Sequence, residues 1–398
     1  MRICFLFNHD QVHQVAHSLP IALALATSGS DNQVVVATTS ARLSEEVRRL
    51  SDGAVGRTVP LVQLGLRRFF SKAAARLLDR IFPIGKILIY KDNLDFFRTI
   101  DMVVVTEKTS LILKTRLRLK HLKIVHTRHG AGDRAIGFDK ASALFDHVLV
   151  SGRKVADRLK AEASLSENRL SIVGYPKFDL MPSPTTILRD KGRPVVLYNP
   201  HPSPHLSSWY AWGRQVLDWF VENNEYFLIF APHIMLFQRK FVFSVDKLRV
   251  DRPGRIAARY LEAENIHVDV GSRALTTMEY TDRADVYLGD ASSQLYEFLK
   301  TPRPCVHLNS HGVAYENDTN YAHWRAGPVV NSMAEFGSAL RTSIERHQSH
   351  YRRTQEELFR YTFDLTREPS SVRAARAIAR IAGEDVDAFS PRDLRAAI

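Results

Sequence analysis

The sequence Val286-Tyr287-Leu288-Gly289-Asp290-Ala291-Ser292-Ser293-Gln294-Leu295-Tyr296-Glu297-Phe298 indicates the fold of this chain most directly. Its apolar run ending in Gly-Asp is typical of a short buried strand. Two serines follow, and then apolar residues recur at helical spacing, as expected where a serine caps a helix. The stretch therefore predicts a strand, a tight polar turn and a helix start, in the order that an α/β protein repeats.

The predicted helix start has two interpretations. It presents free backbone N–H groups and the positive end of the helix dipole, and both favour a phosphate group. An ordinary capped helix of an α/β protein explains the same residues, because this cap rule fits many helices. The turn alone does not decide between them.

The alternation of strand and helix occurs in two successive stretches of the chain. The first contains strands predicted at 2–8, 33–38, 102–106, 123–127 and 147–150. The second contains strands predicted at 195–198, 226–231, 266–270, 285–289 and 304–308. Two such stretches predict two Rossmann-like domains that face one another across a cleft.

A proline-rich segment without apolar periodicity separates these stretches and is expected to link the domains. The expected organisation is a domain at 1–180, a linker at 181–194, a domain at 195–365, a helix at 366–384 and a tail at 385–398. No glycine-rich dinucleotide fingerprint or Walker loop occurs in the sequence, which disfavours a dinucleotide oxidoreductase or a P-loop enzyme. We find no metal-ligand set and expect no cofactor.

Composition places the protein in a reducing compartment. Of the 398 residues only two are cysteines, and both lie inside apolar runs, as core residues do. The apolar run in the first residues is too short, and is interrupted by polar residues too early, for a signal peptide. No apolar stretch approaches the length that spans a bilayer. We therefore expect a cytoplasmic protein, with attachment to the inner face of the plasma membrane as the alternative.

The formal charge of +12 is concentrated in one part of the chain. Between Arg67 and Lys123 there are fourteen Lys and Arg against five Asp and Glu. This excess indicates an anionic partner, and without a nucleic-acid-binding motif we expect it not to be nucleic acid. Residues 64–82 predict an amphipathic helix with a basic face, either an ordinary surface helix or one that contacts anionic lipid.

A small-residue loop follows the strand predicted at 123–127. It contains Arg128, His129 and Gly130, at the strand end where open α/β sheets bind ligands. A histidine beside an arginine suits a general base or a phosphate contact. Taken alone, His129 is better explained as a surface or capping residue.

Four motifs together resemble those of the CDP-glycerol glycerophosphotransferase family, the teichoic-acid polymerases and primases. They are Arg128-His129-Gly130 with Gly137-Phe138-Asp139, then Gly174-Tyr175-Pro176-Lys177-Phe178-Asp179, then Pro232-His233-Ile234, and finally Asp290-Ala291-Ser292-Ser293 with Lys300-Thr301-Pro302. Their order and approximate spacing agree with the family from about residue 100 to about residue 310. The first hundred residues carry no resemblance.

Three positions depart from the family pattern. Arg128 stands where the family has Trp, Ala291 where it has Tyr, and Ile234 where it has Pro. These differences affect donor and acceptor identity more than the fold. They suggest a divergent member that acts on another activated polyol or sugar in capsule or surface-polymer synthesis.

The resemblance implies the two-domain GT-B architecture and a transfer reaction. A hydroxyl of a lipid-linked or polysaccharide acceptor attacks the distal phosphorus of a CDP-polyol, and CMP leaves. His129 is implied as the base, and Arg128 and Asp290 as further catalytic residues. Residues implied to bind substrate are Gly130, His233, Ser292, Ser293, Lys177, Asp179 and Glu297.

Two other functions stay open. A nucleotide-sugar glycosyltransferase or a 2-epimerase-like enzyme of the same architecture would also place a nucleoside diphosphate at the helix start, with Glu297 on the ribose. A non-catalytic protein that docks polymer or lipid on its basic face is the third possibility.

Overall fold

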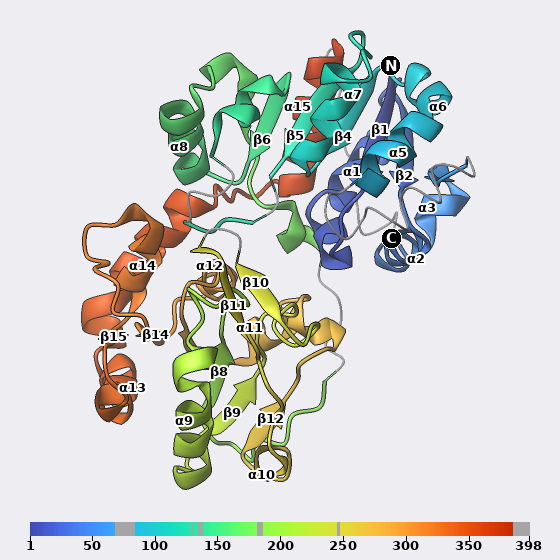
Figure 1. Ribbon diagram of the computed structural model, residues 1–398. Coiled ribbons are helices and arrows are strands. Elements are labelled where there is room, and N and C mark those ends of the chain that lie inside the picture. The colour runs from blue at the N-terminus through green and yellow to red at the C-terminus, as the bar shows by residue number, and fades with distance from the viewer. Residues whose placement is uncertain (68–83, 129, 134–137, 181–185, 245–246, 385–398) are drawn as a thin grey trace. The chain divides into compact units, whose positions relative to one another are not determined.

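The computed structural model describes residues 1–67, 84–128, 130–133, 138–180, 186–244 and 247–384 (Figure 1). Its residues divide into two compact units. Unit 1 holds the described residues of Met1–His129, Ile136–Met181 and Tyr361–Ile398, and unit 2 those of Gly130–Ala135 and Pro182–Arg360. No helix of the described residues is long and apolar enough to cross a membrane.

Unit 1 is built on a seven-stranded parallel sheet in the order β3-β2-β1-β4-β5-β6-β7. Its strands are β1 (Arg2–Phe7), β2 (Gln33–Thr38), β3 (Leu61–Gln63), β4 (Met102–Val105), β5 (Lys123–Thr127), β6 (His147–Val150) and β7 (Leu170–Ile172). Along β1, Phe5 and Phe7 join the core on one face, and Cys4 and Leu6 the core on the other. Burial on both faces explains why these strands read as continuous apolar runs.

The helices of unit 1 lie on both faces of that sheet (Figure 1). They are α1 (Leu19–Thr27), α2 (Ala41–Leu50), α3 (Ala54–Arg57), α5 (Ile84–Asp92), α6 (Leu94–Arg98), α7 (Ile112–Thr115), α8 (Arg153–Ala163) and α15 (Ser370–Ala382). Helix α1 begins just before Pro20, where a missing N–H costs no helical hydrogen bond. Of the helix expected at 64–82, residues 64–67 are not helical and the remainder lies outside the described residues.

The helix α15 completes unit 1 although it lies far along the chain. Its residues Ala375, Ile378 and Ala379 are fully buried in the same core as α1 and the strands. Small alanine side chains let the two helices approach closely. The periodic stretch predicted at 370–382 is thus part of the core of the N-terminal sheet.

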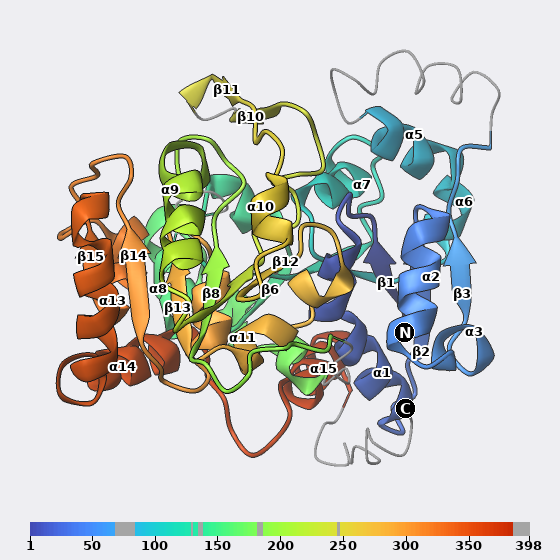
Figure 2. The same cartoon turned by 90° about the horizontal axis from the view of Figure 1, so that it is seen from below.

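Unit 2 is built on a six-stranded parallel sheet in the order β12-β9-β8-β13-β14-β15. The strands are β8 (Val195–Asn199), β9 (Phe227–Phe230), β12 (Ile266–Val268), β13 (Val286–Gly289), β14 (Cys305–Leu308) and β15 (Val329–Val330). The helices are α9 (Trp209–Glu222), α10 (Ala258–Leu261), α11 (Glu279–Arg283), α12 (Gln294–Phe298), α13 (Phe336–Glu345) and α14 (Arg352–Thr362). A separate antiparallel pair, β10 (Val242–Ser244) and β11 (Arg249–Asp251), stands outside these layers (Figure 2).

Two parallel sheets flanked by helices confirm the α/β class expected from the sequence. Each sheet has a point where the strand order reverses: between β1 and β4 in unit 1, and between β8 and β13 in unit 2. Open α/β sheets bind ligands outside the carboxyl ends of the strands at such points. The search for a site therefore begins at these two positions.

Candidate functional site

The reversal point of unit 2 is closed by paired polar groups. Strand β8 ends at Asn199, directly opposite Gly289 at the end of β13. Asn199 Nδ2 donates to the carbonyl of Ala231 at 2.7 Å, and its Oδ1 accepts a 2.7 Å hydrogen bond from Ser292 Oγ. The carboxyl ends of three neighbouring strands are thereby tied to the serine turn after β13.

Asp290 is the centre of that turn. It is 1% exposed. Its Oδ1 accepts hydrogen bonds from the backbone N–H groups of His201 and Ala291, at 2.9 and 2.7 Å. Its Oδ2 accepts from the backbone N–H of Ser208 at 2.6 Å and from Ser208 Oγ at 2.8 Å.

These contacts define what Asp290 can do chemically. Burial raises the pKa of the Asp290 carboxyl, and the four hydrogen bonds act in the opposite direction. Both oxygens are engaged and buried, so the side chain is placed to fix the loops after β8 and β13. This geometry suits a residue that positions the turn.

A second buried carboxylate, Asp133, lies next to this turn. It belongs to the short described loop 130–133, which groups with unit 2. Tyr296 Oη donates to both of its oxygens at 2.7 Å, and the backbone N–H of His323 donates to Oδ2 at 3.0 Å. His323 Nδ1 lies 2.9 Å from the same oxygen. These bonds fasten the loop to α12 and to the segment around His323.

The other side of His323 connects Asp133 to Asp290. His323 Nε2 lies 3.0 Å from the backbone carbonyl of Asp290, and Trp324 Nε1 donates to that carbonyl at 2.9 Å. Gly132 packs so closely that a Cβ there would lie 3.3 Å from Ser293 Cβ. The loop 130–133 is therefore held directly beside the serine turn.

The serine turn offers hydrogen-bond donors. Within the described part of the chain, the backbone N–H groups of Ser292 and Ser293 donate to no acceptor. Ser293 is exposed and its side chain caps nothing, whereas Ser292 is buried. The helix that follows, α12, is only five residues long, so its dipole is weaker than a full helix would give. The donors themselves are what suits an oxyanion here.

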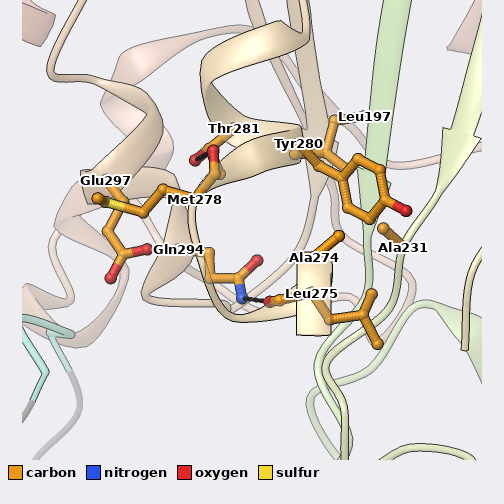
Figure 3. Close-up of a pocket in the computed structure, with 9 residues that line it drawn as sticks. All are labelled: Leu197, Ala231, Ala274, Leu275, Met278, Tyr280, Thr281, Gln294 and Glu297. Atoms are coloured by element: carbon orange, nitrogen blue, oxygen red, sulfur yellow. Dashed lines mark hydrogen bonds between the residues drawn. The ribbon is translucent and has the colours of Figure 1, made fainter. Parts of the chain in front are cut away.

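A small pocket opens between α11, α12 and the end of β8 (Figure 3). It is lined by Leu197, Ala231, Ala274, Leu275, Met278, Tyr280, Thr281, Gln294 and Glu297. In Figure 3, Glu297, Met278 and Thr281 lie on one side of the pocket, and Tyr280 and Ala231 on the other. Gln294 Nε2 donates to the carbonyl of Leu275 at 2.9 Å. Glu297, on the short helix that follows the serine turn, places a carboxylate in the lining of this pocket.

His233 follows β9 at the same carboxyl edge of unit 2. Its backbone N–H donates to the carbonyl of Pro200 at 3.1 Å, and its ring centroid lies 6.1 Å from that of His201. Burial lowers the pKa of His233 to about 4. Near pH 7 it is therefore a neutral imidazole, which contacts a phosphate as a hydrogen-bond donor and not as a cation.

The reversal point of unit 1 carries a cluster that sequence reasoning missed. Lys86 Nζ lies 2.8 Å from Glu107 Oε2 and 3.2 Å from Asp10 Oδ1. His9 Nδ1 lies 3.8 Å from Glu107 Oε1, and Thr106 Oγ1 lies 2.9 Å from His9 Nδ1. Asp10 follows β1, Glu107 follows β4, and Lys86 belongs to α5. Burial raises the pKa of Glu107, but the contacts with His9 and Lys86 outweigh it and lower the pKa to about 2.

Arg128 lies after β5 in unit 1. Its guanidinium carbon is 4.3 Å from the centroid of Phe138, and that of Arg158 is 4.2 Å from the same ring. Burial, and then the charge of Arg158, lowers the pKa of Arg128 to about 10. Arg128 is still cationic near pH 7, and the two cations beside one ring favour an anion between or above them.

The remaining candidates lie apart from these groups. His129 is outside the described residues. Gly130 has a φ of +92°, which favours glycine. Lys177 is buried in unit 1, and Asp179 Oδ2 accepts a 2.6 Å hydrogen bond from the backbone N–H of Ser371. Asp179 thus holds the first turn of α15.

The structure brings together five of the predicted residues in unit 2. Asp290, Ser292, Ser293 and Glu297 are neighbours along one turn and helix of unit 2, and His233 lies at the same sheet edge. Sequence reasoning missed Asp133 and His323. Asp133 lies in the small-residue loop after the predicted strand at 123–127, so it had a signal. His323 had none, because it lies in an irregular segment.

Solved structures with the same fold are known, although the sequence is divergent. The UDP-GlcNAc 2-epimerase from Neisseria meningitidis bound to UDP-GlcNAc matches with a TM-score of 0.58 at 12% identity, over 97% of this chain and 100% of that one. The S. aureus MnaA–UDP structure matches with a TM-score of 0.59 at 12% identity, over 96% and 95%. The wall teichoic acid polymerase TagF, in a form soaked with CDPG, matches with a TM-score of 0.56 at 14% identity, over 97% and 88%.

No protein-family model matches the sequence, and no curated protein sequence matches it. At these identities the structural likeness shows the fold, which is the GT-B fold of TagF and the 2-epimerases. The Neisseria meningitidis epimerase structure is bound to UDP-GlcNAc, and the TagF structure was soaked with CDPG. Their fold covers nearly the whole of this chain.

Proposed function

We propose that this chain is a transferase that moves a polyol-phosphate group, similar to glycerol phosphate, from a CDP-activated donor to a hydroxyl of a surface-polymer or lipid-linked saccharide acceptor. The observation that carries the proposal is the serine turn of unit 2, where two available backbone N–H groups adjoin the Glu297 pocket at the reversal point of the sheet. A nucleoside diphosphate fits both features, because its phosphates suit the N–H groups and its nucleoside suits the Glu297 pocket. The order of the four motifs supports the cytidine donor over other nucleotides.

In this proposal unit 2 binds the donor. The N–H groups of Ser292 and Ser293 hold the diphosphate, and His233 adds a neutral donor to its oxygens. The Glu297 carboxylate accepts hydrogen bonds from the ribose hydroxyls. Asp290 and Asp133 act indirectly, by fixing the turn and the loop 130–133 that present these groups.

The chemical step requires a base and positive charge. The acceptor oxygen forms a bond to the distal phosphorus while the bond from that phosphorus to the oxygen of CMP breaks, and the hydroxyl proton passes to His129. Arg128 stabilises the charge that develops on the phosphoryl oxygens. Gly130 gives the backbone beside His129 its freedom, and Lys177 contributes a further cation to substrate binding.

Unit 1 is proposed to bind the acceptor. The Glu107 carboxylate and the Lys86 ammonium at its reversal point suit a hydroxyl-rich group, because an ionised carboxylate accepts and an ammonium donates. The basic segment 64–82 would attach the protein to an anionic membrane, where a lipid-linked acceptor is found. The enzyme would then act at the inner face of the plasma membrane.

The donor is tested by thermal unfolding with CDP-glycerol, CDP-ribitol, CMP, UDP, UDP-sugars and GDP-sugars. A ligand at about 100 times its Kd adds roughly 2.7 kcal/mol to the folded state. Stabilisation by the cytidine compounds alone is expected. Stabilisation by UDP or GDP compounds would instead favour a nucleotide-sugar glycosyltransferase or an epimerase, and the Glu297 pocket and the serine turn suit those nucleotides as well.

The catalytic role is tested with His129→Ala. Loss of a positioned base lowers turnover by about 10²–10⁴ while donor binding is retained. His121→Ala, an exposed histidine of the same unit, is the matched control. A chain that binds no nucleotide and keeps its biological effect with His129→Ala would contradict the transferase and support a non-catalytic polymer-binding protein.

A further inference from the structure

The hairpin β10–β11 of unit 2 has one face that packs on the protein and one that does not. In its register Phe243 is opposite Val250, and Ser244 is opposite Arg249. Ser244 is buried and its Oγ contacts His205 Nδ1. Because side chains alternate along a strand, Phe243 and Val250 point away from that contact.

The outward face of the hairpin is apolar. Phe243 is 54% exposed, Val250 52% and Leu248 79%. Phe241, just before β10, is 50% exposed. Four large apolar side chains exposed within ten residues form a patch of the kind that marks an interaction site. We call these four residues the hairpin patch.

The base of the hairpin is held firmly to unit 2. Trp209 Nε1 on α9 donates to the carbonyl of Pro253 at 2.9 Å, and Trp209 and Pro253 are both buried. The patch is therefore carried on an anchored support, outside the layers of the six-stranded sheet (Figure 2).

Basic residues surround the hairpin patch. From 239 to 255 the chain has six Lys and Arg against two Asp and Glu. Arg239, Lys240, Lys247 and Arg252 are exposed. The Arg252 guanidinium carbon lies 4.3 Å from the centroid of Phe241, and Arg249 pairs with Asp251 at 2.7 Å. Exposed apolar side chains inside a basic ring are complementary to an anionic bilayer, with its hydrocarbon below and its phosphates at the surface.

We infer that the hairpin patch inserts into the headgroup region of an anionic phospholipid bilayer and that the surrounding Lys and Arg contact the lipid phosphates. A second copy of this chain fits less well, because it would bring two hairpins of like charge together. A stable protein interface needs about 800 Å² and 20–30 residues on each partner, far more than this hairpin presents. The bilayer requires only a few inserted side chains and a positive potential.

The inference rests on residues of unit 2 that are not part of segment 64–82, and it does not depend on the proposed transfer reaction. A protein that binds lipid but transfers nothing would satisfy it. Conversely, an active transferase that acts on soluble acceptors and does not bind vesicles would contradict it.

Sedimentation of the full chain with phospholipid vesicles is the test. The protein is expected to sediment with vesicles of phosphatidylserine and phosphatidylcholine and to stay in solution with phosphatidylcholine alone. Phe243→Ser with Leu248→Ser lowers the partition coefficient by about tenfold or more, because two apolar contacts are lost. Lys240→Glu with Lys247→Glu lowers it by more than about 25-fold, since each basic residue near the surface contributes roughly fivefold and the two added carboxylates are repelled by the anionic lipid.

Matched controls come from the same unit. Leu261→Ser with Ile344→Ser removes two exposed apolar side chains elsewhere, and Arg341→Glu with Arg346→Glu reverses two exposed charges. Both controls are expected to sediment as the unchanged protein does. Equal losses in hairpin and control variants, or none in the hairpin variants, would overturn the inference.

Insertion itself is measured with a fluorophore at the patch. Leu248→Cys labelled with a polarity-sensitive dye gives a site-specific probe, because Cys4 and Cys305 are buried. The emission is expected to rise and shift to the blue on anionic vesicles. An unchanged spectrum would contradict insertion. A molecular mass by light scattering that is lower in the hairpin variants than in the unchanged protein would show that the patch mediates self-association, and would also contradict insertion.

Discussion

His323 and Asp133 form a buried pair in which the histidine contacts one carboxylate oxygen twice. Its backbone N–H lies 3.0 Å and its Nδ1 2.9 Å from Asp133 Oδ2. His323 Nε2 lies 3.0 Å from the carbonyl of Asp290, so both ring nitrogens face acceptors. The pair thus links the loop 130–133 to the turn that Asp290 fixes.

Asp133→Asn is expected to destabilise unit 2 strongly. Asparagine replaces one carboxylate oxygen with an amide nitrogen that accepts no hydrogen bond, so buried donors are left unsatisfied at a cost of about 1–3 kcal/mol each. Urea unfolding followed by tryptophan fluorescence measures the loss, since Trp324 is the neighbour of His323. Tyr296→Phe is the control: it removes one neutral donor and should cost about 1 kcal/mol. An equal cost in both variants would show that Asp133 stabilises unit 2 only through its bond with Tyr296.

Substitution of the two serines of the turn is expected to affect the stability of the protein and its affinity for CMP differently. Ser292→Ala removes the bond to Asn199 inside the protein and should lower the unfolding free energy by about 1–2 kcal/mol. Ser293→Ala, at an exposed position, should leave the midpoint of urea unfolding unchanged. Both variants keep the backbone N–H groups, so CMP should bind to Ser293→Ala within about threefold of its original affinity, by calorimetry. A large loss of affinity would assign the contact to the hydroxyl.

Glu297→Gln is expected to weaken nucleotide binding. A hydrogen bond to a charged group contributes about 1.5–3 kcal/mol, so the Kd for the nucleotide that stabilises the protein should rise about 10–150-fold. Glu222→Gln, at the exposed end of α9, is the matched control for the loss of one negative charge. If both variants bind alike, the pocket of Figure 3 is not the ribose site.

His233 should make the protein less stable in acid. Its pKa is about 4 in the folded protein, below the ordinary value near 6.5, so the unfolded chain takes up the proton first as the pH falls. The contribution is absent above about pH 6.5 and amounts to roughly 2 kcal/mol of lost stability by pH 5. Urea unfolding at pH 7.5 and pH 5 is expected to show a smaller decrease for His233→Asn. The same decrease in both proteins would contradict the low pKa.

Glu107 has a dependence of the same sign at lower pH. Its folded pKa of about 2 lies below the unfolded value, so its ion pairs stabilise the protein fully above about pH 4.5 and are lost as the pH falls toward 2. Glu107→Gln should therefore cost up to about 3 kcal/mol at pH 7, and the difference from the unchanged protein should shrink below pH 4.5. A difference that stays constant with pH would mean that lost packing, and not lost charge, explains the cost.

The strands of both sheets were predictable because they are buried on two faces. Continuous apolar runs such as 102–106 and 195–198 are typical of strands that are buried on both faces of a parallel sheet. β3 and β15 escaped prediction, since three and two residues are too few for a pattern. The helix after Ser293 was predicted, but not that it stops at Phe298, because its length depends on packing against β14 and not on its own sequence.

The site was predictable only where chemistry and chain position coincide. Asp290 and the serines directly follow a strand, so the sequence marks them. His323 and Asp133 are 190 residues apart, and no local pattern joins them. The Lys86–Glu107 cluster was missed for the same reason, because its members come from β1, β4 and α5 and meet only when the strand order reverses.

The burial of α15 against α1 has a consequence for biosynthesis. Chains usually fold from the N-terminal domain onward as they leave the ribosome. Here the core around α1 lacks Ala375, Ile378 and Ala379 until almost all of the chain has been translated. Unit 2 can therefore fold first, while the N-terminal strands, which are translated first, still have one uncovered apolar face. In nascent chains of this protein, the N-terminal segment should therefore need chaperones for the longest time.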